Sequence, residues 1–302
     1  MDNRLTERDS IEIRRLADCT FRQAVELWNQ GFSGYYSDMS TTLEKFTARL
    51  GRESIRTDLS VAAFVNGEPA GFVLIALKEA GGVKIAWNGG TGVSPNQRGK
   101  GLAKLLMREA AEAIKESGAS IAYLEVVQKN AGAIAAYESA GFRKCDGLIG
   151  AKLEGPLPAS AVQADEAYRL RPAKLRELTA LPFFRHDSAW NCQWFNRSDS
   201  EGIAVIDEQG AIGAYAIVRR SYGENGELAG SVLFHCAADP ERPDRSKLAR
   251  AAIAGAFGPA DAAYTRTADN LSMSDPAVTE WLEEAGFKTI YTQYLMVADF
   301  SV

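Results

Sequence analysis

Apolar and polar positions follow two periods along the first half of the chain. Phe21, Ala24 and Trp28 recur at the spacing of a helix face, whereas residues 11–14 alternate like a strand. The same two periods predict strands at 11–14, 60–65, 71–77, 84–93 and 121–127, and helices from 21, from 41, over 102–118 and over 130–140. The order of elements predicts an α+β fold with a mixed, mostly antiparallel sheet flanked by helices.

Short local signals mark the ends of these elements. Asn66-Gly67 tolerates positive φ at both positions and predicts a tight hairpin between two strands. Thr41-Thr42-Leu43-Glu44 has the Thr-x-x-Glu spacing of a capping box and predicts a helix start at Thr41. Gly118 and Gly141 are placed to end two helices.

The pattern of the first half returns in the second half. Gly141-Phe142 is echoed by Gly286-Phe287, 145 residues later, and Gly71 by Gly213, 142 residues later. Two copies of one domain explain this order better than chance matches. We therefore expect domains at 1–154 and 166–302, joined by a proline-containing linker at 155–165.

Composition narrows the class of protein. The 302 residues are 46% hydrophobic and 24% charged, as in ordinary soluble domains. A formal net charge of −5 gives no basic excess for nucleic acid or an anionic membrane. No run of residues approaches the roughly 20 apolar positions of a membrane span, and residues 1–9 lack the apolar run of a secretory signal. We expect a cytoplasmic protein without disulfides or metal, because its four cysteines and two histidines are scattered.

The strongest candidate for chemistry is the glycine-rich segment 93–103, between a strand and a long helix. Gly99 and Gly101 let backbone amides converge on an anion, and the helix N-terminus adds unpaired N–H groups and partial positive charge. The side chains of Arg98 and Lys100 either add positive charge or are solvated. Neither a P-loop nor a dinucleotide fingerprint fits the spacing of these glycines.

This segment resembles the pyrophosphate loop of the GNAT acetyltransferase superfamily, Gln/Arg-x-x-Gly-x-Gly/Ala, through Arg98, Gly101 and Ala103. A second family pattern, an Asn and a Tyr seven residues later ahead of Gly-Phe, is matched by Asn130 and Tyr137. The resemblance covers residues 10–152. It implies that acetyl-CoA is bound by Val93, Arg98, Gly99, Lys100, Gly101, Leu102, Ala103 and Asn130.

The resemblance, strand alternation and the demands of the reaction together suggest catalytic roles. Tyr137 would protonate the departing CoA thiolate, the alternative being a core aromatic at helical spacing. Glu125 would be the general base, or else a solvated charge on its strand. Tyr35, Tyr36 and Asp38 would line the acceptor site or form a surface loop. Water or the terminal carboxylate at Val302 are further candidate bases, and a backbone N–H near Gly92-Val93 would stabilise the oxyanion.

The second copy lacks this chemistry. Leu282 stands where Tyr137 is expected and Asp275 where Asn130 is expected. Its loop has no glycine, and Pro240 and Pro243 remove amide donors. We expect a GNAT-like domain that binds no CoA and supports the first domain or narrows its acceptor site. The adjacent His235 and Cys236 face opposite sides of a strand, which favours structural roles over nucleophilic catalysis.

Together these observations predict an acetyl-CoA-dependent N-acetyltransferase that acts on a primary amine, with a small molecule favoured, and uses no metal. The alternative is a CoA-binding sensor or scaffold that turns over no acceptor. An intact Tyr137 favours the enzyme, whereas the lack of an unambiguous base keeps the alternative open. The sequence identifies neither the acceptor nor the oligomeric state.

Overall fold

The computed structural model describes residues 10–162 and 167–301, and the chain divides into two compact units. The first unit runs to Cys145 and resumes at Met296, and the second covers Asp146–Leu295. Each unit contains strands of the sheet and its own helices. No helix in the described part of the chain is long and apolar enough to cross a membrane.

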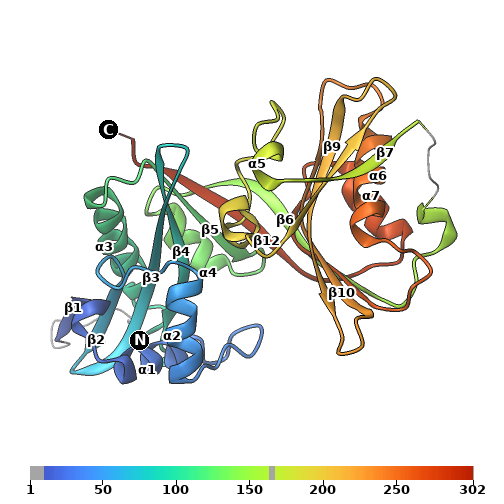
Figure 1. Cartoon of the computed structure of the whole chain (residues 1–302). Coiled ribbons are helices and arrows are strands. Elements are labelled where there is room, and N and C mark those ends of the chain that lie inside the picture. Colours follow the sequence, from blue (N-terminus) through green and yellow to red (C-terminus); the bar gives the residue numbers. More distant parts are fainter. Residues whose placement is uncertain (1–9, 163–166, 302) are drawn as a thin grey trace. The chain divides into compact units, whose positions relative to one another are not determined.

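In the first unit, helices flank the strands of a twisted sheet (Figure 1). The strands are β1 (Ile11–Arg15), β2 (Val61–Val65), β3 (Glu68–Ala80), β4 (Val83–Val93) and β5 (Ile121–Val127). The helices are α1 (Phe21–Gly31), α2 (Leu43–Arg52), α3 (Leu102–Glu116) and α4 (Ala131–Glu138). The sheet order is β1-β2-β3-β4-β5, followed by the end of β12 (Lys288–Asp299).

Strands β4 and β5 pair only at one end. They are parallel at positions 85–87 and 121–123, after which β4 continues to Val93 with no further position paired to β5 among the described residues. By contrast, β1 to β4 pair antiparallel along their lengths. The sheet therefore opens between β4 and β5, on the side from which the glycine-rich segment follows.

Helices cover both faces of this sheet. A Cβ at Gly71 would lie 2.9 Å from Leu106 of α3, whereas the ring of the next residue, Phe72, lies against Gly31 at the end of α1. Because successive strand residues face opposite sides, α3 covers one face and α1 the other. Trp28, Phe46 and Phe72 form an aromatic core beneath α1 and α2.

Several local predictions are confirmed. Asn66 and Gly67 have φ of 54° and 82° and connect β2 to β3, and Gly118 and Gly141 have positive φ after their helices. The predicted start of the second helix is wrong by one residue. Thr42, not Thr41, is the N-cap of α2, and its hydroxyl accepts a hydrogen bond from Lys45 N.

The second unit repeats the order of the first. Its strands are β6 (Arg143–Glu154), β7 (Arg169–Ala173), β8 (Glu201–Ile206), β9 (Ile212–Tyr222), β10 (Leu228–Ala238), β11 (Thr265–Ser272) and β12. Its helices are α5 (Leu175–Leu178), α6 (Arg245–Phe257) and α7 (Pro276–Glu284). In the second unit the sheet order is β12-β6-β11-β10-β9-β8-β7, with β10 and β11 parallel. Residues 143–145 of β6 and the end of β12 lie in the first unit.

Glycines at matching positions of the repeat have the same structural roles in both units. A Cβ at Gly213 would lie 2.8 Å from Leu248 of α6, just as one at Gly71 would press on Leu106 of α3. Gly286 follows α7 with φ of 82°, and Gly141 follows α4 with φ of 89°. In both units a glycine therefore lets the long helix approach the third strand closely.

The two units have exchanged their last strands. From Asp146, β6 pairs antiparallel with β11 of the second unit, whereas β12 from Met296 lies beside β5 of the first. The observed division therefore differs from boundaries at 154 and 166, because strand partners rather than chain order decide which unit a strand joins.

The described part of the predicted linker is packed, not free. Leu157 and Ala161 are buried in the core of the second unit. Leu157 N donates to Ala260 O at 2.8 Å, and Trp281 Nε1 donates to Ala161 O at 3.0 Å. Residues 163–165 of the predicted linker, like 1–9 and Val302, lie outside the described residues.

Candidate functional site

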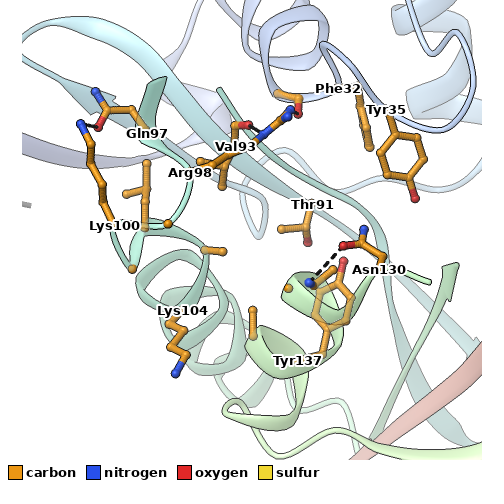
Figure 2. Close-up of a pocket in the computed structure, with 18 of the residues that line it drawn as sticks. Phe32, Tyr35, Thr91, Val93, Gln97, Arg98, Lys100, Lys104, Asn130 and Tyr137 are labelled. Carbon is orange, nitrogen blue, oxygen red and sulfur yellow. Dashed lines mark hydrogen bonds between the residues drawn. The ribbon is translucent and has the colours of Figure 1, made fainter. Parts of the chain in front are cut away.

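A cavity of about 830 Å³ opens in the first unit beside the separated ends of β4 and β5. It is lined by the end of β4, the glycine-rich loop, the first turn of α3, α4, and the segment after α1 (Figure 2). Its lining residues are Gly31, Phe32, Gly34, Tyr35, Tyr36, Thr91, Val93, Gln97, Arg98, Gly99, Lys100, Gly101, Leu102, Ala103, Lys104, Asn130, Gly132, Ala133, Ala136 and Tyr137.

The glycine-rich loop presents backbone amides to this cavity. Gly99 and Gly101 have φ of 76° and 94°, a left-handed conformation that favours glycine, and Gly101 is the N-cap of α3. The N–H groups of Leu102 and Ala103 belong to the first turn of α3, where no helical carbonyl can accept them. The loop therefore has the chemistry of an anion site.

The end of β4 contributes two more amides. Ser94 N donates to Ala70 O at 2.8 Å, so positions 94 and 92 bond to β3 in the alternating antiparallel ladder. The N–H groups of Val93 and Thr91 then point to the opposite side, where β5 has separated from β4. A ligand in the opening between these strands would meet them.

The two cationic side chains of the loop hold protein groups. Arg98 Nε donates to Val93 O at 2.9 Å, and Nη2 donates to Gly31 O at 3.1 Å and Ser33 O at 2.7 Å. Lys100 Nζ donates to Gln97 Oε1 at 3.3 Å. Arg98 is thus an exposed side chain whose Nε and Nη2 donate to backbone carbonyls, and the loop amides and Lys104 also line the cavity.

Tyr137 projects from α4 into the cavity and is 6% exposed. Burial raises the pKa of its phenol to about 12, and a hydrogen bond with Thr91 opposes that rise. The phenol therefore carries its proton at neutral pH. Thr91 is held in turn by Asn88, whose Nδ2 donates to Thr91 Oγ1 at 2.9 Å.

Comparison with known proteins agrees with this geometry. A family model described as the acetyltransferase (GNAT) family matches residues 21–142, the stretch that builds the cavity. A curated relative, streptothricin acetyltransferase of Streptomyces lavendulae, is 39% identical over 100 residues, which is 32% of this chain and 49% of the relative. The chain thus matches about half the length of that relative.

Solved structures extend the likeness to the whole chain. A GCN5-related N-acetyltransferase from Sphaerobacter thermophilus has a TM-score of 0.63 at 15% identity and covers 99% of this chain and 98% of its own. A tandem GNAT protein from the clavulanic acid biosynthesis pathway has a TM-score of 0.57 at 14% identity, with coverage of 97% and 99%. The predicted fold, two tandem GNAT-like domains, is confirmed.

Asn130 is the N-cap of the helix that carries Tyr137. Its Oδ1 accepts a hydrogen bond from Ala133 N at 3.3 Å, and it also lines the cavity (Figure 2). In the second unit Asp275 is likewise the N-cap of α7, and its Oδ1 accepts from Ala277 N at 3.1 Å. The position is therefore a helix cap in both domains, whether or not it contacts a ligand.

The aromatic segment after α1 borders the cavity. Tyr35 lies within hydrogen-bond reach of Asn130, and burial raises the pKa of its phenol. Tyr36 Oη donates to Lys129 O at 3.3 Å. Asp38 does not line the cavity with them. It lies in an adjoining hollow of the same loop, and its carboxylate accepts a hydrogen bond from Ser40 N at 2.9 Å, which lowers its pKa.

Glu125 lies on β5 but does not line the cavity itself. Its Oε2 accepts a hydrogen bond from Trp87 Nε1 on β4 at 2.7 Å. The side chain is half-buried, and its negative charge is close enough to raise the pKa of Tyr137 slightly. The structure thus places Glu125 near the phenol, on the strand that bounds the opening.

In the second unit, charged side chains of the chain itself fill the loop that corresponds to the glycine-rich loop. Asp244, the N-cap of α6, accepts hydrogen bonds from Arg242 Nε and Nη2 at 2.9 Å each, and from Tyr168 Oη at 2.7 Å. Arg242 Nη1 also donates to Asp207 Oδ2 at 2.6 Å. A carboxylate and its ion-pair network thus sit where the first domain offers amides.

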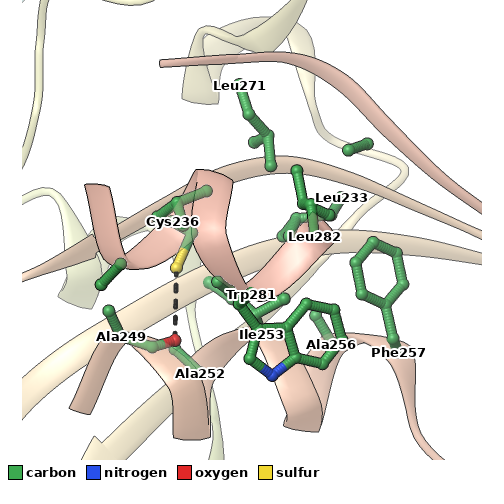
Figure 3. Packing of buried hydrophobic residues seen from close by; sticks show 14 of the residues in the cluster. Leu233, Cys236, Ala249, Ala252, Ile253, Ala256, Phe257, Leu271, Trp281 and Leu282 are labelled. Atoms are coloured by element: carbon green, nitrogen blue, oxygen red, sulfur yellow. Dashed lines mark hydrogen bonds between the residues drawn. The ribbon is translucent and has the colours of Figure 1, made fainter. Parts of the chain in front are cut away.

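Other residues of the second unit at positions that correspond to the cavity of the first lie in its hydrophobic core (Figure 3). Leu282, at the position of Tyr137, is 2% exposed and packs with Trp281 of α7. Cys236 faces this core, and its Sγ donates to Ala249 O at 3.9 Å, while burial raises its pKa. Leu282 is aliphatic and cannot supply the proton that a phenol at this position would supply.

His235 faces the other side of the same strand. Its ring stacks on Phe184 and Tyr215, with centroids 5.2 and 5.5 Å away, and Nε2 donates to Arg185 O at 3.1 Å. Burial, followed by the charge of Arg185, lowers its pKa to about 4. The imidazole is therefore neutral at pH 7 and lies on the opposite face from Cys236, as strand alternation predicts.

Sequence reasoning missed several cavity residues, among them Gly31, Phe32, Thr91 and Lys104. Thr91 and Lys104 had a usable signal. Thr91 lies two strand positions before Val93 and so faces the same side, and Lys104 is in the first turn after the glycines. Gly31 and Phe32 reach the cavity only through the packing of α1 on β4, which no local pattern reveals.

Proposed function

We propose that the chain transfers an acetyl group from acetyl-CoA to a primary amine of a small molecule, with the cavity of the first GNAT domain as the donor site. The observation that carries this proposal is the placement of one buried phenol and one glycine-rich anion loop in a single cavity. A bound thioester with its pyrophosphate on the loop would have its sulfur near that phenol. Streptothricin acetyltransferase, the relative of the first domain, supports a small-molecule acceptor.

The loop amides from Gly99 to Ala103 would hold the pyrophosphate, and the amides of Val93 and Thr91 would hold the pantetheine arm or the carbonyl oxygen. The amine nitrogen attacks the carbonyl carbon, so that the C–N bond forms and the oxygen becomes negative. When the C–S bond breaks, sulfur takes the electron pair and the proton of Tyr137. The proton of the attacking amine passes to Glu125 or to water.

The raised pKa of Tyr137 has two consequences for this step. The phenol stays protonated throughout the physiological range, as a general acid must. A pKa near 12 also makes it a weaker acid than an exposed tyrosine, so its advantage is position rather than acidity. The Thr91 hydrogen bond works in the useful direction, because it stabilises the phenolate that the transfer leaves.

The test is a calorimetric titration of acetyl-CoA into the purified chain. We expect one site per chain, because the second domain's loop is filled by Asp244 and Arg242. Lys104→Glu should weaken binding about tenfold or more, because it reverses a charge at the pyrophosphate end. Arg108→Glu, one turn along the same helix and outside the cavity lining, is the matched control and should bind normally.

Absence of binding would overturn the acetyltransferase proposal, and two sites would contradict the assignment of the second domain. The alternative, a CoA-binding sensor, predicts binding without acetylation of any amine in a broad panel. A wild-type chain that acetylates one of them, with loss of the rate in Tyr137→Phe, would exclude it.

A further inference from the structure

Residues 31–36, which we call the strap, form one wall of the donor cavity. The strap begins with the last residue of α1 and contributes Gly31, Phe32, Gly34, Tyr35 and Tyr36 to the lining. It leads directly into the 37–40 loop, which carries the candidate acceptor residue Asp38. The strap therefore touches both the donor cavity and the loop beyond it.

One side of the strap is fixed by Arg98. Nη2 of the guanidinium donates to Gly31 O and Ser33 O, and Nε donates to Val93 O. A single side chain therefore joins the strap to β4 (Figure 2). The carbonyls at the end of α1 carry partial negative charge, which makes a cation there favourable. Arg98 directly precedes Gly99, so its backbone moves with the anion loop.

The other side of the strap is fixed at α4. Tyr36 Oη donates to Lys129 O, and Tyr35 reaches Asn130. Edge contacts join Phe32 to Tyr35 and Tyr35 to Tyr36, with ring centroids 5.2 and 5.1 Å apart. The strap thus spans the cavity from the anion loop to the helix that carries Tyr137.

We propose that Arg98 is a positioning residue that couples donor binding to the order of the strap. An anion on the amides of residues 99–103 fixes the loop, Arg98 transmits that order to Gly31 and Ser33, and the acceptor side of the site is completed only with donor bound. This inference rests on the proposed function, since it takes the cavity as the acetyl-CoA site.

Arginine is needed for this role because its planar fork reaches several carbonyls at once, whereas lysine offers one point charge. Arg98→Ala should release the strap yet leave the loop amides in place. Arg98→Lys should hold the strap better than Arg98→Ala but less well than the wild type. Arg108→Ala removes an exposed arginine from α3, ion-paired with Glu109 at 3.2 Å, and serves as the control.

The experiment measures amide hydrogen exchange of residues 32–40 in the full chain, with and without CoA as the probe, beside calorimetric CoA affinity. In the wild type and Arg108→Ala, CoA should slow exchange in the strap about tenfold. In Arg98→Ala that slowing should be lost, while the dissociation constant for CoA changes less than the roughly tenfold expected of a direct ligand contact.

Equal slowing in Arg98→Ala and wild type would overturn the coupling. If Arg98→Ala fails to fold, as judged by circular dichroism, Arg98→Lys decides: full slowing overturns the coupling, and a loss of half or more supports it. A wild-type chain that does not bind CoA would overturn the proposed function and the coupling with it. Wild-type binding without any change in strap exchange would overturn the coupling alone.

Discussion

At the scale of single residues, burial decides which titratable groups take part in chemistry. Tyr137 and His235 are both almost fully buried and both keep their neutral forms at pH 7. The phenol lines an open cavity, whereas the imidazole is stacked between rings with its Nε2 bonded to a carbonyl. Access to a ligand, rather than the size of the pKa shift, separates a candidate acid from a structural group.

Replacing Tyr137 with Phe should retain acetyl-CoA affinity and lower the turnover of an accepted amine by about 10²–10⁴-fold, because only the proton donor is lost. Steady-state kinetics together with calorimetry measure both quantities. Tyr222→Phe, an exposed tyrosine of the second unit, is the control and should behave as wild type. Undiminished turnover in Tyr137→Phe would remove the phenol from the mechanism.

His235 should make stability depend on pH. Its folded pKa of about 4 lies below the unfolded value near 6.5, so only the unfolded chain takes up this proton as pH falls between them. The neutral imidazole therefore does not reduce the free energy of unfolding above pH 6.5, and about 2 kcal/mol of that free energy should be lost by pH 5. Urea unfolding at pH 7 and pH 5 should show this loss reduced in His235→Phe. The exposed His186→Gln is the control, and an unchanged pH dependence in His235→Phe would contradict the assignment.

At the scale of elements, close approach of α1 to β4 builds the cavity wall. A Cβ at Gly92 would lie 2.5 Å from the Phe72 ring and 2.9 Å from Gly31 Cα. The strap begins at Gly31 beside β4 because Gly31 and Gly92 let the end of α1 contact this strand. A local sequence pattern marks Gly92 as a strand glycine, but its partner across the packing is 61 positions away in the sequence.

Gly92→Ala should consequently destabilise the first unit by about 1–3 kcal/mol, because an added methyl group overpacks this contact. Gly51→Ala in α2 meets no atom within 4 Å and should be neutral or slightly stabilising, by up to about 1 kcal/mol, from helix propensity. Denaturant unfolding of both variants measures the difference. Equal stabilities would show that α1 can shift without cost.

At the scale of the whole molecule, the exchange of last strands joins distant parts of the sequence. Met296 and Val297 of β12 are 0% and 6% exposed, and Phe300 N donates to Ser120 O at 2.8 Å. These residues belong to the first unit although they follow the entire second unit in the chain. The sheet beside the cavity thus includes the end of β12.

A chain ending at Leu295 should destabilise the first unit by about 3–6 kcal/mol, from the lost burial of Met296 and Val297 and an uncovered edge of β5. Acetyl-CoA binding should fall with it. A chain ending at Phe300 keeps the strand and is the control. Thermal unfolding and acetyl-CoA titration of both chains decide the matter, and full binding by the shorter chain would show that the first unit does not need β12.

The sequence by itself determined the elements whose causes are local. The positive φ of Asn66-Gly67, the strand at 121–127, the long helix after Gly101 and the repeat of Gly71 in Gly213 all depend on nearby residues or on periodicity. Only the tertiary structure decided which unit each last strand joins, which backbone carbonyls Arg98 donates to, and that Glu125 accepts a hydrogen bond from Trp87. These depend on packing between residues far apart in the chain, where the energetic partner of a side chain is set by the fold and leaves no local pattern.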